Sequence, residues 1–223
     1  MGRPGADTGV ALGLLMATLA RFAAWIARLD AVYAEQKDYL TDLDAAIGDA
    51  DHGINMARGF AAAHQAIVAA PPADVGALLK AVAMTLIRTV GGASGPLYGT
   101  FFLRAAPVAG AVAEVDAAGV EALFAAGAAG IAERGKAVVG DKTMIDAWGP
   151  AVEALGASRA AGGAVADMLA AAAAAAAAGR DATLPLVARK GRASYLGERS
   201  RGHIDPGAAS TALLLAAAHE TLG

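Results

Sequence analysis

The 223-residue chain contains no cysteine, and this absence excludes several kinds of chemistry at once. Disulfide cross-links, zinc–thiolate sites and cysteine nucleophiles all need a thiol. Aromatic residues make up only 5% of the chain, and 18 lysines and arginines face 21 acidic residues, for a net charge of −3. Because proteins that bind a nucleic-acid backbone present a broad basic surface, this balance argues against a nucleic-acid partner.

Long apolar runs are also missing, although 57% of the residues are hydrophobic. The longest run, residues 168–178, is too short to cross a bilayer, so we expect no membrane span. Residues 10–20 have the length of a signal-peptide core. However, helical apolar spacing continues beyond them through Phe22, Ile26 and Leu29, as in a core helix. We therefore expect a cytoplasmic protein that keeps this segment.

Strand patterns are nearly absent, and helical spacing of apolar residues dominates the chain. Glycine and proline breaks divide it into about eight helices joined by short connections, which favour antiparallel neighbours. The alanine tract at residues 170–178 is predicted to be a packed helix rather than a linker. The sequence thus predicts an all-α antiparallel barrel or bundle, with one domain over residues 10–223 after a flexible N-terminus, residues 1–9.

Three carboxylates occur within eight residues, at Asp44, Asp49 and Asp51. If a helix ends between them, they can surround one point, and Gly48 provides the backbone freedom for that break. Carboxylate oxygens without thiols suit Mg²⁺, Mn²⁺ or Ca²⁺ better than Zn²⁺. The alternative is that Asp49 and Asp51 only cap the helix that follows.

A calcium-binding EF-hand loop is excluded by two residues. Its sixth position should be glycine and is Ile54, and its twelfth should be glutamate and is Phe60. Mg²⁺ usually binds through a few carboxylates together with substrate phosphates. A three-carboxylate magnesium site therefore implies a phosphorylated ligand.

A second polar cluster, Gly91–Pro96, lies between two helical stripes. It can be a plain helix–helix turn. Three glycines and Ser94, with Pro96 at an expected first helical position, can instead expose backbone N–H groups at a helix start, where phosphate binds well.

A third cluster covers residues 130–146. Its first part resembles a P-loop, but Ala137 replaces the Ser or Thr that would bind magnesium and no strand precedes it, so we reject that motif. The second part, Gly140–Asp146, can be a helix start with Asp141 as N-cap, and its neighbours can still bind a ligand.

The last cluster, residues 190–207, is the most polar stretch of the chain. Charge runs are usually solvated loops, but glycine, tyrosine and the Asp205-Pro206-Gly207 turn favour an ordered anion-binding loop. Arg192 beside a bound phosphate would neutralise transferring charge.

Taken together, the four clusters resemble the nucleotide-binding L subunits of dihydroxyacetone kinases, from about Leu12 to the C-terminus. The motifs are Leu43–Met56, Gly91–Gly99, Gly140–Met144 and Arg192–Ala208, in the family's order. The resemblance implies an eight-helix antiparallel barrel with a nucleotide, ADP or ATP, at one end.

The resemblance also implies roles for individual residues. Two Mg²⁺ ions would be held by Asp44, Asp49 and Asp51. The segment His52, Gly53, Ile54 and Asn55, together with Ala93 and Ser94, would line the phosphates and ribose. Adenine would be bordered by Gly135 and Met144, and the pocket would be closed by Arg192, the candidate catalytic residue, with Asp205, Pro206 and Gly207.

In that family a separate K subunit binds dihydroxyacetone, and the L subunit delivers the γ-phosphoryl group. A free-standing L chain points to the branch in which bound ADP is rephosphorylated by a phosphohistidine carrier of the sugar phosphotransferase system, the M-type protein. Two alternatives remain: an ADP-sensing regulatory protein, and an L-type subunit that serves another small ketose or polyol.

Overall fold

The computed structural model describes residues 16–223, and the predicted flexible segment 1–9 lies outside them. Within this range the chain forms nine α-helices, one 3₁₀ helix (η1) and two short strands. Their bounds are β1 Ala17–Thr18, α2 Leu19–Glu35, α3 Lys37–Ile47, α4 His52–Ala69, α5 Val75–Thr89, α6 Ser94–Ala109, β2 Glu114–Val115, α7 Ala117–Gly135, α8 Ile145–Ala160, α9 Val165–Ala182, η1 Arg192–Ser200 and α10 Pro206–Leu222.

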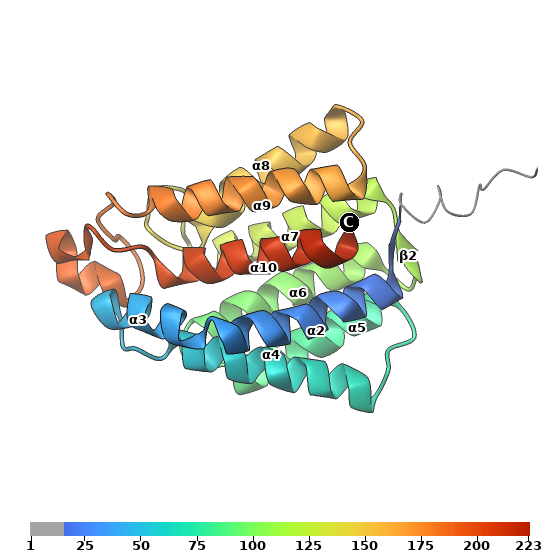
Figure 1. Ribbon diagram of the computed structural model, residues 1–223, viewed down its shortest axis with the longest axis horizontal. Helices are drawn as coiled ribbons and strands as arrows, with labels where there is room; N and C mark the ends of the chain where they lie inside the picture. Colours follow the sequence, from blue (N-terminus) through green and yellow to red (C-terminus); the bar gives the residue numbers. More distant parts are fainter. Residues whose placement is uncertain (1–15) are drawn as a thin grey trace, which may run out of the picture.

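Eight of the helices form a closed antiparallel ring, as the sequence predicts. Helix α2 packs on α4, each helix from α4 to α10 packs on the next, and α10 packs back on α2 (Figure 1). Helix α3 extends α2 beyond the ring and contacts α4 and η1. Because neighbours run in opposite directions, alternate connections gather at opposite ends of the ring.

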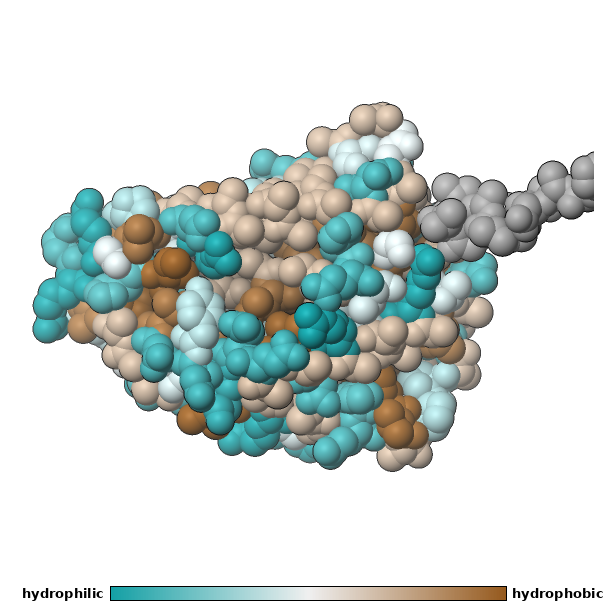
Figure 2. Space-filling model, in the orientation of Figure 1, coloured by the Kyte–Doolittle hydropathy of each residue, from teal (hydrophilic) through white to brown (hydrophobic). Residues whose placement is uncertain are grey.

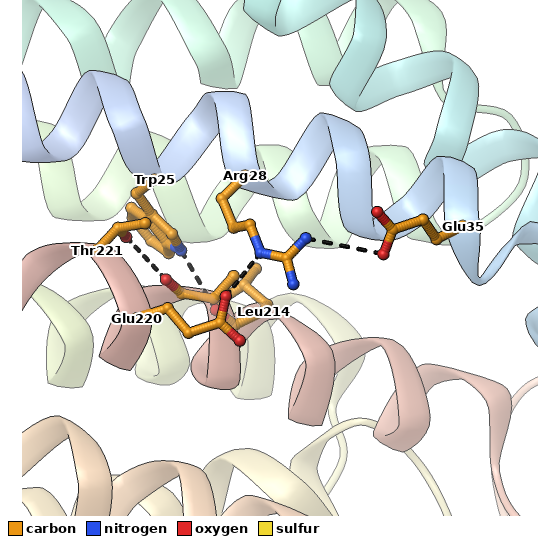
Figure 3. Close-up of polar contacts among 7 residues, drawn as sticks. Trp25, Arg28, Glu35, Leu214, Glu220 and Thr221 are labelled. Atoms are coloured by element: carbon orange, nitrogen blue, oxygen red, sulfur yellow. Dashed lines mark hydrogen bonds and ion pairs between the residues drawn. The ribbon is translucent and has the colours of Figure 1, made fainter.

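The first and last ring helices are joined by polar contacts as well as by packing (Figure 3). Arg28 donates from Nε to Glu220 at 2.6 Å, and a second nitrogen lies 3.7 Å from Glu35. Trp25 donates its indole N–H to the Leu214 carbonyl at 3.2 Å. The contacts to Glu220 and Leu214 close the ring between parts of the chain far apart in sequence, while the contact to Glu35 lies within α2.

Aromatic rings fill the centre of the ring despite their small number. Trp25 lies 5.6 Å from both Phe102 and Phe124, and Phe101 stacks on Trp148 at 4.5 Å between centroids. All five side chains are almost completely buried. The few aromatic residues are therefore concentrated where they bury most apolar surface.

Two predictions of element boundaries need correction. The structure divides the predicted first helix at Gln36, between α2 and α3, where neither glycine nor proline marks a break. The helix after Gly91–Pro96 begins at Ser94, so Pro96 is its third residue and not its first. The predicted helix over the alanine tract is confirmed as part of α9, which buries Ala172 and Ala176.

Among residues 16–223, no helix has both the length and the apolar character that crossing a membrane requires.

Candidate nucleotide and metal site

A cavity of about 390 Å³ opens at the end of the ring that carries η1. The surface over η1, at the left of Figure 2, is mostly hydrophilic. Four connections supply the walls: the α3–α4 turn, the α5–α6 turn, the α7–α8 loop and the α9–α10 segment. The lining includes twelve of the predicted site residues: Asp44, Asp49, Asp51, His52, Ala93, Ser94, Gly135, Met144, Arg192, Asp205, Pro206 and Gly207.

The three predicted metal ligands converge at this cavity. Asp44, Asp49 and Asp51 each offer a carboxylate oxygen, and these oxygens lie within 4.8 Å of one another. The turn between them is tight: a Cβ at Gly48 would overlap the Asp44 carboxylate, and Ala50 adopts a left-handed conformation with φ 61°. The predicted helix break at Gly48 is therefore what brings the carboxylates together.

Asp44 is buried and also orders the start of the next helix. Its Oδ2 accepts the backbone N–H groups of Asp51 at 2.9 Å and His52 at 3.2 Å. This contact fixes the Asp49–Asp51 turn against the end of α3. An all-oxygen set of three carboxylates on a fixed turn fits a hard divalent cation such as Mg²⁺.

Arg192 reaches the same carboxylates from η1. Its guanidinium lies 2.9 Å from Asp49 Oδ2, although both side chains are partly exposed. Such an exposed pair contributes at most about 1 kcal/mol to stability. Its main effect is to hold the Arg192 guanidinium in position. Arg192 thus stands beside the carboxylate triad, where it can neutralise an anionic ligand.

His52 connects the cavity wall to a buried polar network. Its Nδ1 lies 3.0 Å from Ser94 Oγ, and its Nε2 lies 2.8 Å from Ser210 Oγ, which in turn contacts the Tyr98 hydroxyl at 2.7 Å. Burial lowers the pKa of His52 to about 4, against the opposing effects of the Asp44 charge and a hydrogen bond to the Pro206 carbonyl. The ring is therefore neutral at pH 7 and acts as a fixed hydrogen-bonding link between α4, α6 and α10.

The start of α6 has the features of an anion site. No side chain caps it: its N-cap is Ala93, and Gly92 before it has φ 63°. The first-turn N–H groups of Ser94 and Gly95 therefore remain available, and the helix dipole favours negative charge there. Since Ala93 and Ser94 line the same cavity as the carboxylate triad, a phosphate bound there could contact both.

The α7–α8 loop does not begin its helix where the sequence suggests. Asp141 is not the N-cap, because α8 starts at Ile145 after Lys142 turns the chain with φ 62°. The loop N–H groups of Gly140 and Thr143 are instead accepted by Asp146, at 2.6 and 2.7 Å. Two carboxylates thus order this wall: Asp146 inside the helix, and Asp141 before it, which accepts the Val138 N–H at 3.1 Å.

Asp205 caps α10 and is buried at the base of the cavity. Its carboxylate accepts the Ala208 N–H at 2.7 Å, and its own N–H donates to Thr183 Oγ1 at 3.0 Å. Burial raises the pKa of Asp205 to about 7, with a further increase from Asp146, while the Ala208 N–H and Lys142 oppose the rise. The capping carboxyl therefore titrates near neutral pH.

Three predicted nucleotide contacts do not line the cavity. Gly53 packs against the Lys37 carbonyl, Ile54 is about half exposed, and Asn55 is buried and accepts a hydrogen bond from Arg58 at 2.6 Å. All three lie in the first turn of α4, behind or beside the wall. Their role toward a nucleotide stays a prediction.

Two residues of the third polar cluster, residues 130–146, were not predicted to have a role in the site: Lys142 and Asp146. Lys142 lines the cavity and is almost completely buried. Lysine between glycine, aspartate and threonine normally indicates a solvated turn, and its burial depends on partners distant in sequence. Neither spacing nor composition gives a signal for such a contact.

Fold and site together define an all-helical domain with a carboxylate triad and an uncapped helix start facing one cavity. The chain belongs to the DAK2 domain family, which matches residues 46–220. It is 47% identical to the "PEP-dependent dihydroxyacetone kinase, ADP-binding subunit DhaL" of Escherichia coli K12, over 86% of this chain and 91% of that protein. It is 41% identical to the PTS-dependent dihydroxyacetone kinase ADP-binding subunit of Lactococcus lactis, over 89% and 95%.

The fold also matches that of a solved protein. The crystal structure of the dihydroxyacetone kinase from C. freundii, in complex with AMP-PNP and Mg²⁺, superposes with a TM-score of 0.69 and 28% identity. The match covers 99% of this chain but only 37% of that one, so this chain spans about a third of the longer kinase. The resemblance inferred from the four motifs is thereby confirmed.

Proposed function

We propose that this chain is the ADP-binding subunit of a dihydroxyacetone kinase, a phosphotransferase that works with a partner subunit. The observation that carries this proposal is the convergence of Asp44, Asp49 and Asp51 in the same cavity as the uncapped start of α6. Relatives with 41–47% identity bear that name, and the solved kinase binds AMP-PNP with Mg²⁺.

Each group of the cavity then has a part in phosphoryl transfer. The triad would hold Mg²⁺, two ions in our proposal, and the bound metal supplies charge neutralisation for the phosphates. The N–H groups at the start of α6 would bind phosphate oxygens, and Arg192 would neutralise charge on the transferring group. The wall formed by Gly135 and Met144 would border adenine.

Among the described residues around the cavity, His52 is already bonded to Ser94 and Ser210, and the Asp205 carboxylate is engaged in capping α10, so neither is free to serve as a base for a sugar hydroxyl. We therefore propose that dihydroxyacetone is held by a K-type partner. The names of the relatives, PEP-dependent and PTS-dependent, support a phosphohistidine carrier of the M type as the phosphoryl donor. We also propose a cytoplasmic protein that keeps the segment carrying Phe22, Ile26 and Leu29, because these three side chains lie in the core.

The proposal is tested by titration calorimetry of the 223-residue chain with ADP, with and without Mg²⁺. Affinity should fall strongly when a chelator removes the metal, because the phosphates would then meet three carboxylates without compensation. Equal affinity in both conditions would contradict the metal-triad assignment. Transfer to dihydroxyacetone should appear only after a K-type subunit is added, and turnover by the isolated chain would contradict the division of labour.

A further inference from the structure

Lys142 is an unusual residue in this cavity wall. Its side chain is only 1% exposed, although lysine is rarely buried without strong compensation. Its backbone is left-handed, with φ 62°, a conformation that costs an L-residue roughly 1 kcal/mol. Two unfavourable features at one position call for a compensating interaction.

The ammonium group supplies that interaction by joining three segments. Nζ donates to the Thr183 carbonyl at 2.7 Å and to the His203 carbonyl. Thr183 ends α9, His203 lies just before α10, and Lys142 itself belongs to the α7–α8 loop. Since two donors are engaged with carbonyls, Lys142 acts as a cross-link rather than as a free cation for a ligand.

The segments that Lys142 joins carry adjoining parts of the cavity wall. Met144, two residues after Lys142, lies on one wall, and Asp205–Gly207, two residues after His203, form the other. The walls meet directly: a Cβ on Gly207 would lie 3.4 Å from the Met144 Cβ. A shift at Lys142 would therefore change the spacing between them.

Two buried carboxylates act on the charge of the ammonium group without forming an ion pair with it. Asp146 orders the loop that carries Lys142, and Asp205 caps α10. Both exert an attractive charge effect on Lys142, although burial is the larger influence and lowers its pKa. An apolar side chain of similar size would avoid the cost of burying a charge but could not hold these loops together.

We propose that Lys142 is a positioning residue for the bound nucleotide, fixing the α7–α8 loop against the start of α10. This inference rests on the proposed function, because it assumes that a nucleoside in the cavity contacts both of these adjoining walls. The carboxylate triad and the start of α6 do not depend on Lys142. Its loss should therefore weaken contacts to the nucleoside more than contacts to the phosphates.

The test compares two ligands in the Lys142→Met variant, which keeps the length of the side chain but removes its donors. Affinities for ADP and for inorganic pyrophosphate, both with Mg²⁺, are measured by calorimetry. We expect ADP to bind about tenfold more weakly or worse, since displacement of a positioning group by about an ångström can have such an effect. Pyrophosphate affinity should change less than about twofold, since its contacts are unaltered.

The matched control is Leu78→Ala, which removes a buried side chain at the opposite end of the ring. It should lower the melting temperature without changing either affinity. If Lys142→Met does not fold, Lys142→Gln, which retains one amide donor, is measured by the same criteria and should show an intermediate loss for ADP.

Each outcome has a distinct meaning. If wild-type protein binds ADP and the Lys142 variant binds it equally well, the positioning role is wrong while the proposed function stands. Equal losses for ADP and pyrophosphate would mean that Lys142 only stabilises the fold, which also overturns the inference. If wild-type protein binds no ADP in the presence of Mg²⁺, the proposed function itself fails.

Discussion

The two ends of the helical ring differ in how the free N–H groups of their helix starts are satisfied. At the end away from the cavity, each helix start has a polar side chain nearby in sequence: Thr18, Asp74 and Asp116 cap α2, α5 and α7, and Asp167 accepts the N–H of Ala164, the residue before α9. At the cavity end Asp205 caps α10 and Thr143 Oγ1 accepts the first N–H of α8, while the start of α4 uses Asp44 of another helix and α6 has no side-chain cap. The helix starts away from the cavity all have a local acceptor, whereas at the cavity end the start of α6 is left uncapped and that of α4 is capped from a distance, which leaves groups there available to form a site.

The largest effect should come from removing one metal carboxylate. Asp49→Asn or Asp51→Asn should reduce phosphoryl transfer by roughly a thousandfold or more, because phosphate charge would no longer be neutralised. The helical circular-dichroism signal should persist. Asp116→Asn, the same change at the other end, should leave transfer unaltered in an assay containing the partner subunits. Unfolding of both triad variants would mean that these carboxylates are structural.

Asp205 should make stability depend on pH in an unusual direction. Its pKa of about 7 in the folded chain exceeds the unfolded value of 3.8, so the folded state holds the proton more tightly. Stability from this group is therefore present below about pH 4 and lost as pH rises through 7, by up to roughly 4 kcal/mol. Relative to Asp205→Asn, wild-type protein should lose stability across this window in urea denaturation.

His52 has the opposite effect, because its lowered pKa makes stability rise with pH between about 4 and 6.5. This effect is present in both proteins, so it cancels in the difference in unfolding free energy between wild type and Asp205→Asn. A difference between wild type and Asp205→Asn that does not vary with pH would show that Asp205 is ionised throughout.

At the opposite end, loss of a cap should affect stability only. Asp74→Ala and Asp116→Ala should each cost about 1 kcal/mol, because each leaves a first-turn N–H without its acceptor. For a chain of this size that corresponds to about 2–4 °C in melting temperature. ADP affinity should be unchanged, and a coupled loss of affinity would show that the two ends are not independent.

The smallest effect should be seen at the rim of the cavity. Arg199 is an exposed residue of η1, and Arg199→Glu should weaken association with a partner subunit a few-fold at low salt by reversing a rim charge. The loss should shrink as ionic strength rises, while ADP stays bound. Lys80→Glu on α5 is the control with the same change of charge. Salt-independent weakening would point to misfolding of η1.

The features that the sequence could predict are those whose partners are close in the chain. Asp44, Asp49 and Asp51 fall within eight residues, so spacing and one glycine were enough to predict their convergence. The helices followed from apolar periodicity, but the break at Gln36 carries no glycine or proline and was missed. Long-range contacts were not accessible: Lys142 bonds carbonyls 41 and 61 residues away, and His52 contacts a serine 158 residues away.

The closure of the ring by α2 and α10 also fixes where a neighbouring domain can be attached. Arg21, in the first turn of α2, donates to the Leu222 carbonyl at the end of α10, so both helices leave the ring at the same end, away from the cavity. Helix α10 has 17 residues, which corresponds to about 26 Å. A sugar-binding domain linked to either of these helix ends would thus begin its tether a full helix length from the phosphates. Its linker would have to run back along the outside of the ring to bring an acceptor to the nucleotide of the same molecule.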